Sequence, residues 1–193
     1  MTRKTGIAAG LAILIIIAAA FVFLGPANRN GLGPRLEGQV QYFTLAGGGR
    51  AGPESAWFDR NGGEISLEDF RGRVVLVNFW ASWCELCLRE LPSMSRLQVE
   101  MAGSDFTVIA INIDREGLPV AAPYSERFGL DALEIYLDPR SRVAREVGVN
   151  QMPTTVLYDR DGNEIGRLER SAEWDEPEAK ALLRFFIDKS LPI

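Results

Sequence analysis

The chain has 193 residues, of which 47% are hydrophobic and 24% are charged, and these ordinary globular values exclude wholesale disorder and fibrous structure. Its formal net charge of -5 argues against nucleic-acid binding, which requires a basic surface. The chain contains no histidine, so Ser-His-Asp catalysis, Cys-His catalysis and histidine metal ligation are all excluded.

An apolar segment near the N-terminus predicts a membrane anchor. Residues 7–24 are almost entirely Ile, Ala, Leu, Phe and Val, and as a helix they would extend about 27 Å, close to the hydrocarbon thickness of a bilayer. Arg3 and Lys4 precede this segment, so the positive-inside rule keeps the N-terminus cytoplasmic and exports the rest of the chain. A cleaved signal peptide is the alternative, although its cleavage site at residues 25–27 would contain an unfavourable proline.

These features divide the chain into four parts. We expect a cytoplasmic tip (1–6), a transmembrane signal anchor (7–24), a linker (25–37) and an exported globular domain (38–193). The linker is assigned from its Gly, Pro and Asn content. The chain after residue 27 carries 19 basic and 26 acidic residues, so its surface is not suited to lying along anionic lipid headgroups.

The exported part alternates predicted strands and helices. The expected strands are residues 40–45, 57–59, 64–67, 74–80, 106–113, 133–137, 154–158 and 164–168, with a loop at 46–53. The expected helices are residues 84–101, 119–128, 139–147 and 177–189. Asn-Gly and Asp-Gly pairs at residues 61–63 and 161–163 predict hairpin turns. This order of elements is typical of an α/β fold with a mixed sheet.

The two cysteines, Cys84 and Cys87, lie where the first buried strand meets the first long helix. Free backbone N–H groups and the helix dipole favour a thiolate at a helix N-terminus, so Cys84 is the expected nucleophile. Cys87, one turn into the helix, is placed to resolve a mixed disulfide without large motion. The pattern indicates thiol-disulfide exchange by a redox-active Cys84–Cys87 disulfide, with no other cofactor.

Three other uses of the cysteine pair remain open. A structural disulfide across two intervening residues would constrain the unfolded chain little. A zinc site needs about four ligands, so two thiolates would suffice only in a dimer. A Cu(I) ion accepts soft thiolates, and Met152 could lie near them. Redox exchange fits best, and we expect a monomeric domain without a resident metal.

Two motifs resemble those of thioredoxin-fold proteins. Residues 77–87 read VNFWASWCELC, and residues 151–155 read QMPTT. With the predicted anchor, they are most similar to the membrane-anchored TlpA/ResA-type thiol-disulfide reductases, and residues 66–73 and 171–174 resemble TlpA in particular. The resemblance covers residues 40–190. It implies a thioredoxin-like fold, in which a mixed central sheet is flanked by helices and carries an N-terminal β-hairpin extension and a helical insert at 119–137.

The resemblance also implies roles for individual residues. Cys84 would be the exposed nucleophile and Cys87 its buried partner. Pro153 matches the cis-proline that faces the cysteine pair, and its loop would let the backbone of Met152 pair with an extended substrate segment. Glu90 matches an acidic residue placed to exchange a proton with Cys87, although a solvent-exposed glutamate is the alternative.

Several positions depart from the thioredoxin pattern or remain ambiguous. Asn78 stands where thioredoxin has a buried aspartate, which moves the expected proton-transfer role to Glu90. Leu86 replaces a proline found in thioredoxin and many relatives, and this change should alter the reduction potential. Glu85 disfavours a thiolate at the neighbouring cysteine by its charge, which suits a reductant. Trp83 is either a substrate-docking residue or a packing residue.

The resemblance implies a reductase in the bacterial periplasm, anchored once in the inner membrane. A DsbD- or CcdA-like membrane electron donor would restore the dithiol, because the outer compartment is kept oxidising. The clients would be exported disulfide-containing proteins: a copper-delivery protein, the copper-binding subunit of cytochrome oxidase, or apocytochrome c.

The choice among these clients and functions depends on short motifs. Reductases dedicated to apocytochrome c usually carry Gly-Val-Tyr-Gly before the cis-proline region, whereas residues 148–151 read GVNQ, so we favour oxidase copper-site assembly. Copper chaperones of thioredoxin fold use Cys-x-x-x-Cys and a histidine, and this chain has neither. Peroxidases of peroxiredoxin type carry a threonine three residues before the cysteine, where Ala81 lies here.

Overall fold

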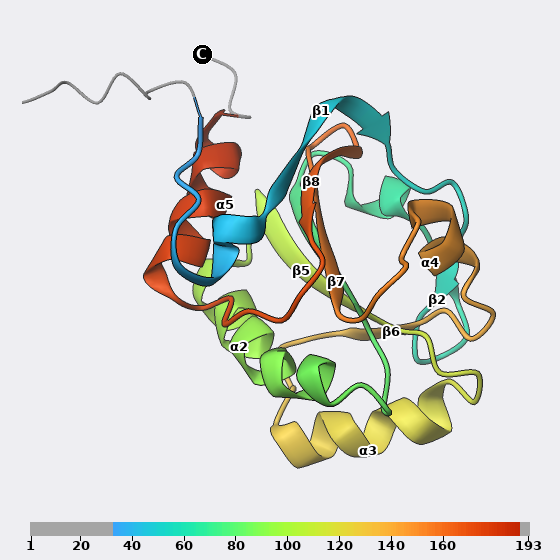
Figure 1. Ribbon diagram of the computed structural model, residues 1–193. Coiled ribbons are helices and arrows are strands. Elements are labelled where there is room, and N and C mark those ends of the chain that lie inside the picture. The colour runs from blue at the N-terminus through green and yellow to red at the C-terminus, as the bar shows by residue number, and fades with distance from the viewer. Residues whose placement is uncertain (1–32, 190–193) are drawn as a thin grey trace, which may run out of the picture. The chain divides into compact units, whose positions relative to one another are not determined.

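The computed structural model describes residues 33–189. These residues build an eight-stranded sheet with the strand order β1-β8-β7-β4-β5-β6-β2-β3 (Figure 1). The strands are β1 (Thr44–Ala51), β2 (Trp57–Phe58), β3 (Glu64–Ile65), β4 (Val74–Trp80), β5 (Phe106–Asn112), β6 (Ile135–Leu137), β7 (Thr154–Tyr158) and β8 (Asn163–Leu168).

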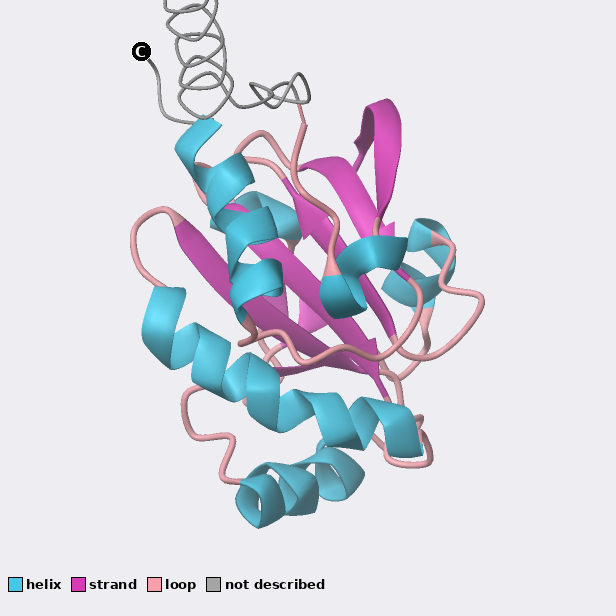
Figure 2. Ribbon diagram, turned by 60° about the vertical axis from the view of Figure 1, so that its left-hand side comes forward, coloured by secondary structure: helices cyan, strands magenta, loops and turns pink. Residues whose placement is uncertain are grey.

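The helices lie on both faces of this sheet. They are the α-helices α2 (Glu85–Met101), α3 (Leu118–Phe128), α4 (Arg142–Val147) and α5 (Pro177–Lys189) and the 3-10 helices η1 (Gly38–Tyr42) and η2 (Leu67–Phe70). Side chains of α2, α3 and α5 pack into one hydrophobic core, and side chains of α4 pack into a second core. Figure 2 shows α2 and α5 in front of the strands.

Strand β4 occupies the centre of the sheet and positions the cysteine segment. All seven residues of β4 and all seven of β5 are buried, as the apolar runs predict. Neighbouring side chains of β4 point to opposite faces, so Leu76 belongs to the first core and Val77 to the second. β4 pairs in parallel with β5 and antiparallel with β7, which confirms the expected mixed sheet.

Both predicted hairpins are present. β2 pairs antiparallel with β3, and β7 pairs antiparallel with β8. In the second turn, the carboxylate of Asp159 accepts hydrogen bonds from the backbone N–H groups of Asp161 and Asn163, at 2.9 and 2.7 Å. Gly162 adopts a φ of 72°, which glycine tolerates best. The expected helical insert corresponds to α3, which lies between β5 and β6.

The structure corrects the prediction for residues 38–53. The expected strand at 40–45 is instead η1, in which Val40 is fully buried in the first core. The strand β1 begins at Thr44 and continues through glycines that we assigned to a loop. Its ends pair with β8, and the register shifts between Leu45 and Arg50. A Cβ atom at Gly166 would lie 2.4 Å from the carbonyl oxygen of Thr44, so this pairing requires glycine in β8.

The remaining boundaries differ by a few residues. The helix expected at 139–147 begins later, at Arg142, because Pro139 and Arg140 form a turn before it. The anchor predicted at residues 7–24 and most of the predicted linker lie outside the described residues. Within residues 33–189, no helix combines the length and the apolar content needed to cross a bilayer.

Candidate active site

The two cysteines form a disulfide at the N-terminus of α2. Cys84 is the N-cap residue, and its sulfur accepts a hydrogen bond from the backbone N–H of Cys87 at 3.2 Å. The Cα atoms of the two residues lie 5.3 Å apart. Cys84 thus follows the buried strand β4 and lies at the N-terminus of α2, where unpaired backbone N–H groups favour a negative charge on sulfur.

The two cysteines differ in their exposure to solvent, although by less than we expected. Cys87 is fully buried, whereas Cys84 keeps an exposed fraction of 7%. The expectation of an exposed nucleophile is therefore corrected for this oxidised form, in which Cys84 is largely covered. Trp83 and Leu86 on either side of Cys84 are exposed, Trp83 by 68%. Two exposed apolar side chains therefore lie within two residues of Cys84 in the chain.

Glu90 is buried in the protein interior, so the alternative of a solvent-exposed glutamate is wrong. It lies one helical turn beyond Cys87, on the same side of α2. Its Oε1 accepts a hydrogen bond from the side-chain amide of Asn78 at 2.7 Å, and its Oε2 accepts one from the backbone N–H of Ala172 at 3.1 Å. Burial raises the pKa of Glu90 from 4.5 to about 8, and the hydrogen bonds from Ala172 and Asn78 oppose this rise.

The segment before α5 is hydrogen-bonded to the side chain of Glu90 and, through Ser93, to its backbone. Besides the bond from Ala172, the backbone N–H of Trp174 donates to the hydroxyl of Ser93 at 3.0 Å. That hydroxyl donates to the carbonyl oxygen of Glu90 at 2.7 Å. Trp174 is fully buried, which suits a packing residue.

The proline loop and the buried carboxyl group share a hydrogen-bond network. The Met152–Pro153 peptide bond is cis, as the resemblance implied. Pro153 is buried, while Met152 is half-buried and contacts both hydrophobic cores. Two residues further, the hydroxyl of Thr155 accepts a hydrogen bond of 3.0 Å from the same Asn78 amide that bonds Glu90. The network therefore joins β4, α2 and β7.

Asp114 is a buried residue beside the cysteine segment that our sequence analysis missed. Its carboxylate accepts hydrogen bonds from the backbone N–H of Ser82 at 2.7 Å and from the hydroxyl of Ser82 at 3.1 Å. The side chain of Asn112 donates to the same carboxylate at 2.8 Å. Asp114 thus fixes the turn that leads from β4 to Cys84. Polar residues at the carboxyl end of a buried parallel strand were the signal that could have identified it.

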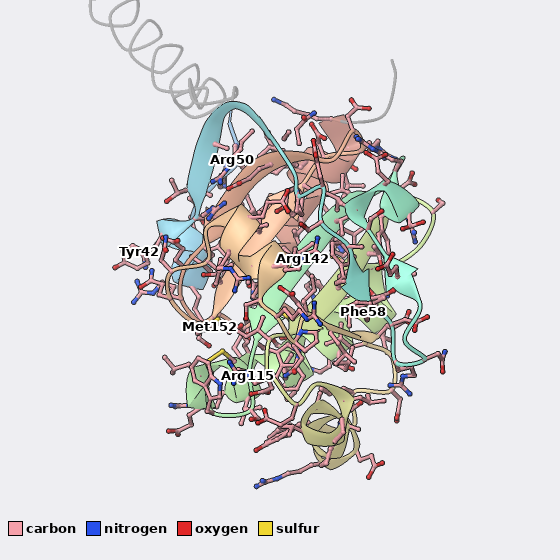
Figure 3. The ribbon with its side chains drawn as sticks, turned by 90° about the vertical axis from the view of Figure 1, so that its right-hand side faces the viewer. Tyr42, Arg50, Phe58, Arg115, Arg142 and Met152 are labelled. Atoms are coloured by element: carbon pink, nitrogen blue, oxygen red, sulfur yellow. A yellow bond between two sulfur atoms is a disulfide. The ribbon has the colours of Figure 1, made fainter. Side chains whose placement is uncertain are left out.

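This arrangement suits proton-coupled sulfur chemistry. A dithiol must lose two protons when it becomes a disulfide and must regain them on reduction. A carboxyl group with a pKa of about 8 is mostly neutral at pH 7 and still changes charge near that pH. Glu90 is the buried titratable side chain on the side of α2 that carries Cys87. Figure 3 shows Met152 and the disulfide next to each other on one face of the molecule.

The fold and this site define a thioredoxin-like protein with a redox-active cysteine pair. The model of the Redoxin family matches residues 48–183, more than half of the chain, and the chain belongs to this family. Its cysteine pair and its relatives make it a thiol-disulfide oxidoreductase of the TlpA/ResA type.

Similar proteins agree with this assignment. The thiol-disulfide oxidoreductase ResA of Geobacillus thermodenitrificans is 35% identical over 119 residues, which cover 62% of this chain and 67% of ResA. ResA of Bacillus anthracis is 28% identical over 120 residues, covering 62% of this chain and 68% of that protein. A crystal structure of a putative thiol:disulfide interchange protein DsbE from Chlorobium tepidum superimposes with a TM-score of 0.66 at 27% identity, covering 75% of this chain and 99% of that one.

Proposed function

We propose that this protein reduces disulfides of exported client proteins from the outer face of the bacterial inner membrane. The supporting observation is the pairing of a fully buried Cys87 with a buried carboxyl group, Glu90, one helical turn away. The carboxyl group supplies a proton acceptor or donor to a sulfur that water does not reach. The lack of histidine favours a reductant over an oxidant, as does the negative charge of the exposed Glu85, which an ion pair with Arg89 at 3.3 Å offsets in part.

The proposed reaction begins with the reduced protein. The Cys84 thiolate attacks one sulfur of the client disulfide, and the other client sulfur leaves as a thiolate and takes up a proton. In the molecules in which Glu90 is ionised, Cys87 then loses its proton to this carboxylate, and the Cys87 thiolate attacks Cys84. The second client sulfur leaves as a thiolate and takes up a proton, and the Cys84–Cys87 disulfide closes. Two electrons pass to the client, and a membrane dithiol donor of the DsbD or CcdA type restores the protein.

The proposed docking surface consists of the exposed Trp83 and the half-buried Met152, and the buried Pro153 shapes the loop that presents Met152. The exposed indole of Trp83 offers apolar area next to Cys84, and the half-buried Met152 precedes Pro153 on the facing loop. An extended client segment would pair with the backbone of Met152 and bring its disulfide to Cys84. The domain acts as a monomer and needs no cofactor besides its own disulfide.

Among client classes we favour proteins that assemble the copper site of cytochrome oxidase. The support is the segment at residues 148–151, which reads GVNQ and lacks the tyrosine usual in reductases dedicated to apocytochrome c. Asn150 and Gln151 are exposed directly before the Met152 loop, so they would face the client.

The reduction potential of the Cys84–Cys87 pair tests the direction of electron flow. A potential within some tens of millivolts of that of thioredoxin, about -270 mV, is expected of a reductase. A potential near about -120 mV, as in strong oxidants, would contradict the proposal because the pair would then donate disulfides.

Single cysteine variants test the order of attack and identify the client. Cys87→Ser should accumulate a mixed disulfide through Cys84, because the resolving thiol is missing, whereas Cys84→Ser should form none. Non-reducing gels and mass spectrometry of membranes would identify the trapped protein. Capture of a copper-delivery protein or of the copper-binding oxidase subunit is expected, whereas capture of apocytochrome c alone would point to the alternative pathway. A Cys87→Ser variant that traps nothing, while Cys84→Ser does, would reverse the assigned roles.

A further inference from the structure

An arginine groove lies beside the turn that follows β5. The groove, of about 580 Å³, is lined by Ile113, Arg115, Pro139, Arg140, Ser141 and Arg145. Arg115, Arg140 and Arg145 are exposed, and among the residues that the structure describes no acidic side chain lines the groove with them. Because guanidinium groups stay charged at any physiological pH, this surface carries three positive charges in a chain whose formal net charge is -5.

The acidic residues nearest in sequence to these arginines are occupied elsewhere. The carboxylate of Asp138 accepts hydrogen bonds from the backbone N–H groups of Arg142 and Ala144, at 2.8 and 3.0 Å. Glu146 accepts hydrogen bonds from the backbone N–H groups of residues 54 and 55, at 2.6 and 3.1 Å. Asp114 bonds the turn before the cysteines, as described above.

Within the described part of the chain, the groove arginines have no acidic side chain at ion-pair distance, although the charge of Arg145 still acts on the buried carboxylate of Asp138. Across residues 33–189, Arg115, Arg140 and Arg145 form no ion pair within 4.0 Å. Glu116, which is exposed next to Arg115, does not line the groove. Three such guanidinium groups around one hollow repel one another, so an external anion is the partner that they suit.

The groove is connected directly to the active-site segment. The backbone N–H of Ile113 donates to the carbonyl oxygen of Trp80 at 3.0 Å, four residues before Cys84. The backbone N–H of Asp138 donates to the carbonyl oxygen of Asn112 at 2.8 Å, so the turn that carries Arg140 is held against the same strand end. Figure 3 shows Arg115 on the face that also carries Met152 and the disulfide.

We propose that this arginine groove binds Asp or Glu side chains of the client protein that flank the disulfide to be reduced. The proposal rests on the reductase function proposed above and specifies its substrate class. The rest of the acidic surface repels an acidic client, so a local cluster of arginines would both admit such a segment and fix its orientation beside Cys84. Each carboxylate can pair with a guanidinium group through two parallel hydrogen bonds.

Three synthetic peptides provide the probe. Each contains one intramolecular disulfide in the same ring, flanked by three Asp, three Ser or three Lys residues. The second-order rate constant for oxidation of the reduced full-length protein, kept in neutral detergent, is measured by tryptophan fluorescence in stopped flow. At low ionic strength, we expect the Asp peptide to react about tenfold faster than the Ser peptide, and the Lys peptide to react more slowly than both. Added salt should reduce these differences because the groove is open to solvent.

Charge-reversal variants test whether the groove causes the preference for the Asp peptide. The triple variant Arg115→Glu, Arg140→Glu, Arg145→Glu should reverse the preference and react faster with the Lys peptide. The control carries the same change of charge at three other exposed arginines: Arg35→Glu, Arg60→Glu, Arg127→Glu. The control should keep the preference of the wild type for the Asp peptide. Thermal unfolding of both triple variants shows whether each remains folded.

The outcomes separate this proposal from the function on which it rests. If the protein reduces the Ser peptide but shows equal rates with all three peptides, or if both triple variants lose the Asp preference equally, the groove proposal is wrong and the reductase function stands. If none of the three peptides is reduced, the proposed function fails. Should the groove variant prove unfolded, the single variants Arg115→Gln and Arg140→Gln replace it, and each should lose part of the Asp preference that Arg60→Gln retains.

Discussion

The side-chain amide of Asn78 donates a hydrogen bond of 2.7 Å to the carboxyl group of Glu90, and both residues are fully buried. The same amide donates to Thr155 at 3.0 Å, while the Oδ1 atom of Asn78 has no hydrogen-bond partner among the described residues. The backbone N–H of Ala172 provides Glu90 with a second donor. These donors favour the carboxylate, but burial has the larger effect and raises the pKa of Glu90 to about 8.

The raised pKa of Glu90 predicts that the oxidised protein loses stability as pH increases. Between pH 4.5 and about 8, the folded protein holds a proton that the unfolded chain has released. The free energy of unfolding should therefore decrease with rising pH, by up to about 1.4 kcal/mol per pH unit. Urea unfolding of the disulfide form at pH 5, 6, 7 and 8 measures this slope. Glu90→Gln should flatten the decline, and the surface control Glu126→Gln should leave it unchanged. An equal slope in Glu90→Gln and wild type would contradict the assignment.

Asn78→Asp should place a second carboxyl group against Glu90. Two carboxyl groups at this distance cannot both ionise without strong repulsion, so one pKa rises further. We expect a small effect on the free energy of unfolding at pH 5 and a loss of about 3 kcal/mol at pH 8, because a buried charge is left unpaired. The double variant Asn78→Asp, Glu90→Gln restores an amide–carboxylate pair and should recover most of that loss. Equal stability losses at both pH values would show that packing, not charge, is responsible.

Ser93→Ala tests the attachment of the segment before α5. The Ser93 hydroxyl accepts the hydrogen bond of the Trp174 backbone N–H, and both residues are buried. Its removal leaves that N–H group without a partner and should lower the free energy of unfolding by about 1–3 kcal/mol. Ser95→Ala, two residues along the same helix, serves as the control and should cost less. Urea unfolding distinguishes the two, and a neutral Ser93→Ala would mean that Trp174 is held by its packing alone.

Trp83→Ala tests whether the exposed indole beside Cys84 contributes to client docking. Since Trp83 is 68% exposed, its removal should change the free energy of unfolding by no more than about 0.5 kcal/mol. The rate constant for reduction of a protein disulfide should fall by about tenfold, while that for a small uncharged disulfide stays the same. Val99→Ala, at a 74% exposed position further along α2, should affect neither rate. If the rate constants for both substrates fall equally, Trp83 acts on the reactivity of the cysteines and not on client docking.

The central strands and the helices could be predicted from sequence because their residues follow strong local patterns. The strand Val74–Trp80 and the helix Pro177–Lys189 have the predicted bounds. The unbroken apolar run of the strand and the amphipathic pattern of the helix are each sufficient to predict the element from its own residues. The β1 strand could not be predicted, because three consecutive glycines indicate a turn, and the pairs with β8 that define the strand form on either side of these glycines. Such pairing is decided by residues more than a hundred positions away.

The candidate site also has a part that could be predicted from sequence and a part that could not. Cys84, Cys87 and Glu90 share one helical segment, so their spacing along the chain is enough to predict that they lie together. The contacts of Glu90 with Asn78 and Ala172 join residues on three separate segments, and no local pattern encodes them. The arginine groove likewise depends on a turn after β5 and a turn before α4 meeting in space.

The hydrogen bond from Ala172 to Glu90 gives the chain an internal spectroscopic reporter. An amide that donates to a carboxylate forms a stronger bond than one that donates to a neutral carboxyl group, so the Ala172 amide proton should shift in an NMR spectrum as Glu90 titrates. This single resonance would follow the proton on Glu90 without labelling the cysteines or perturbing them. Comparing its titration in the dithiol and disulfide states would reveal how far the charge on this carboxyl group is linked to the oxidation state of the sulfur pair.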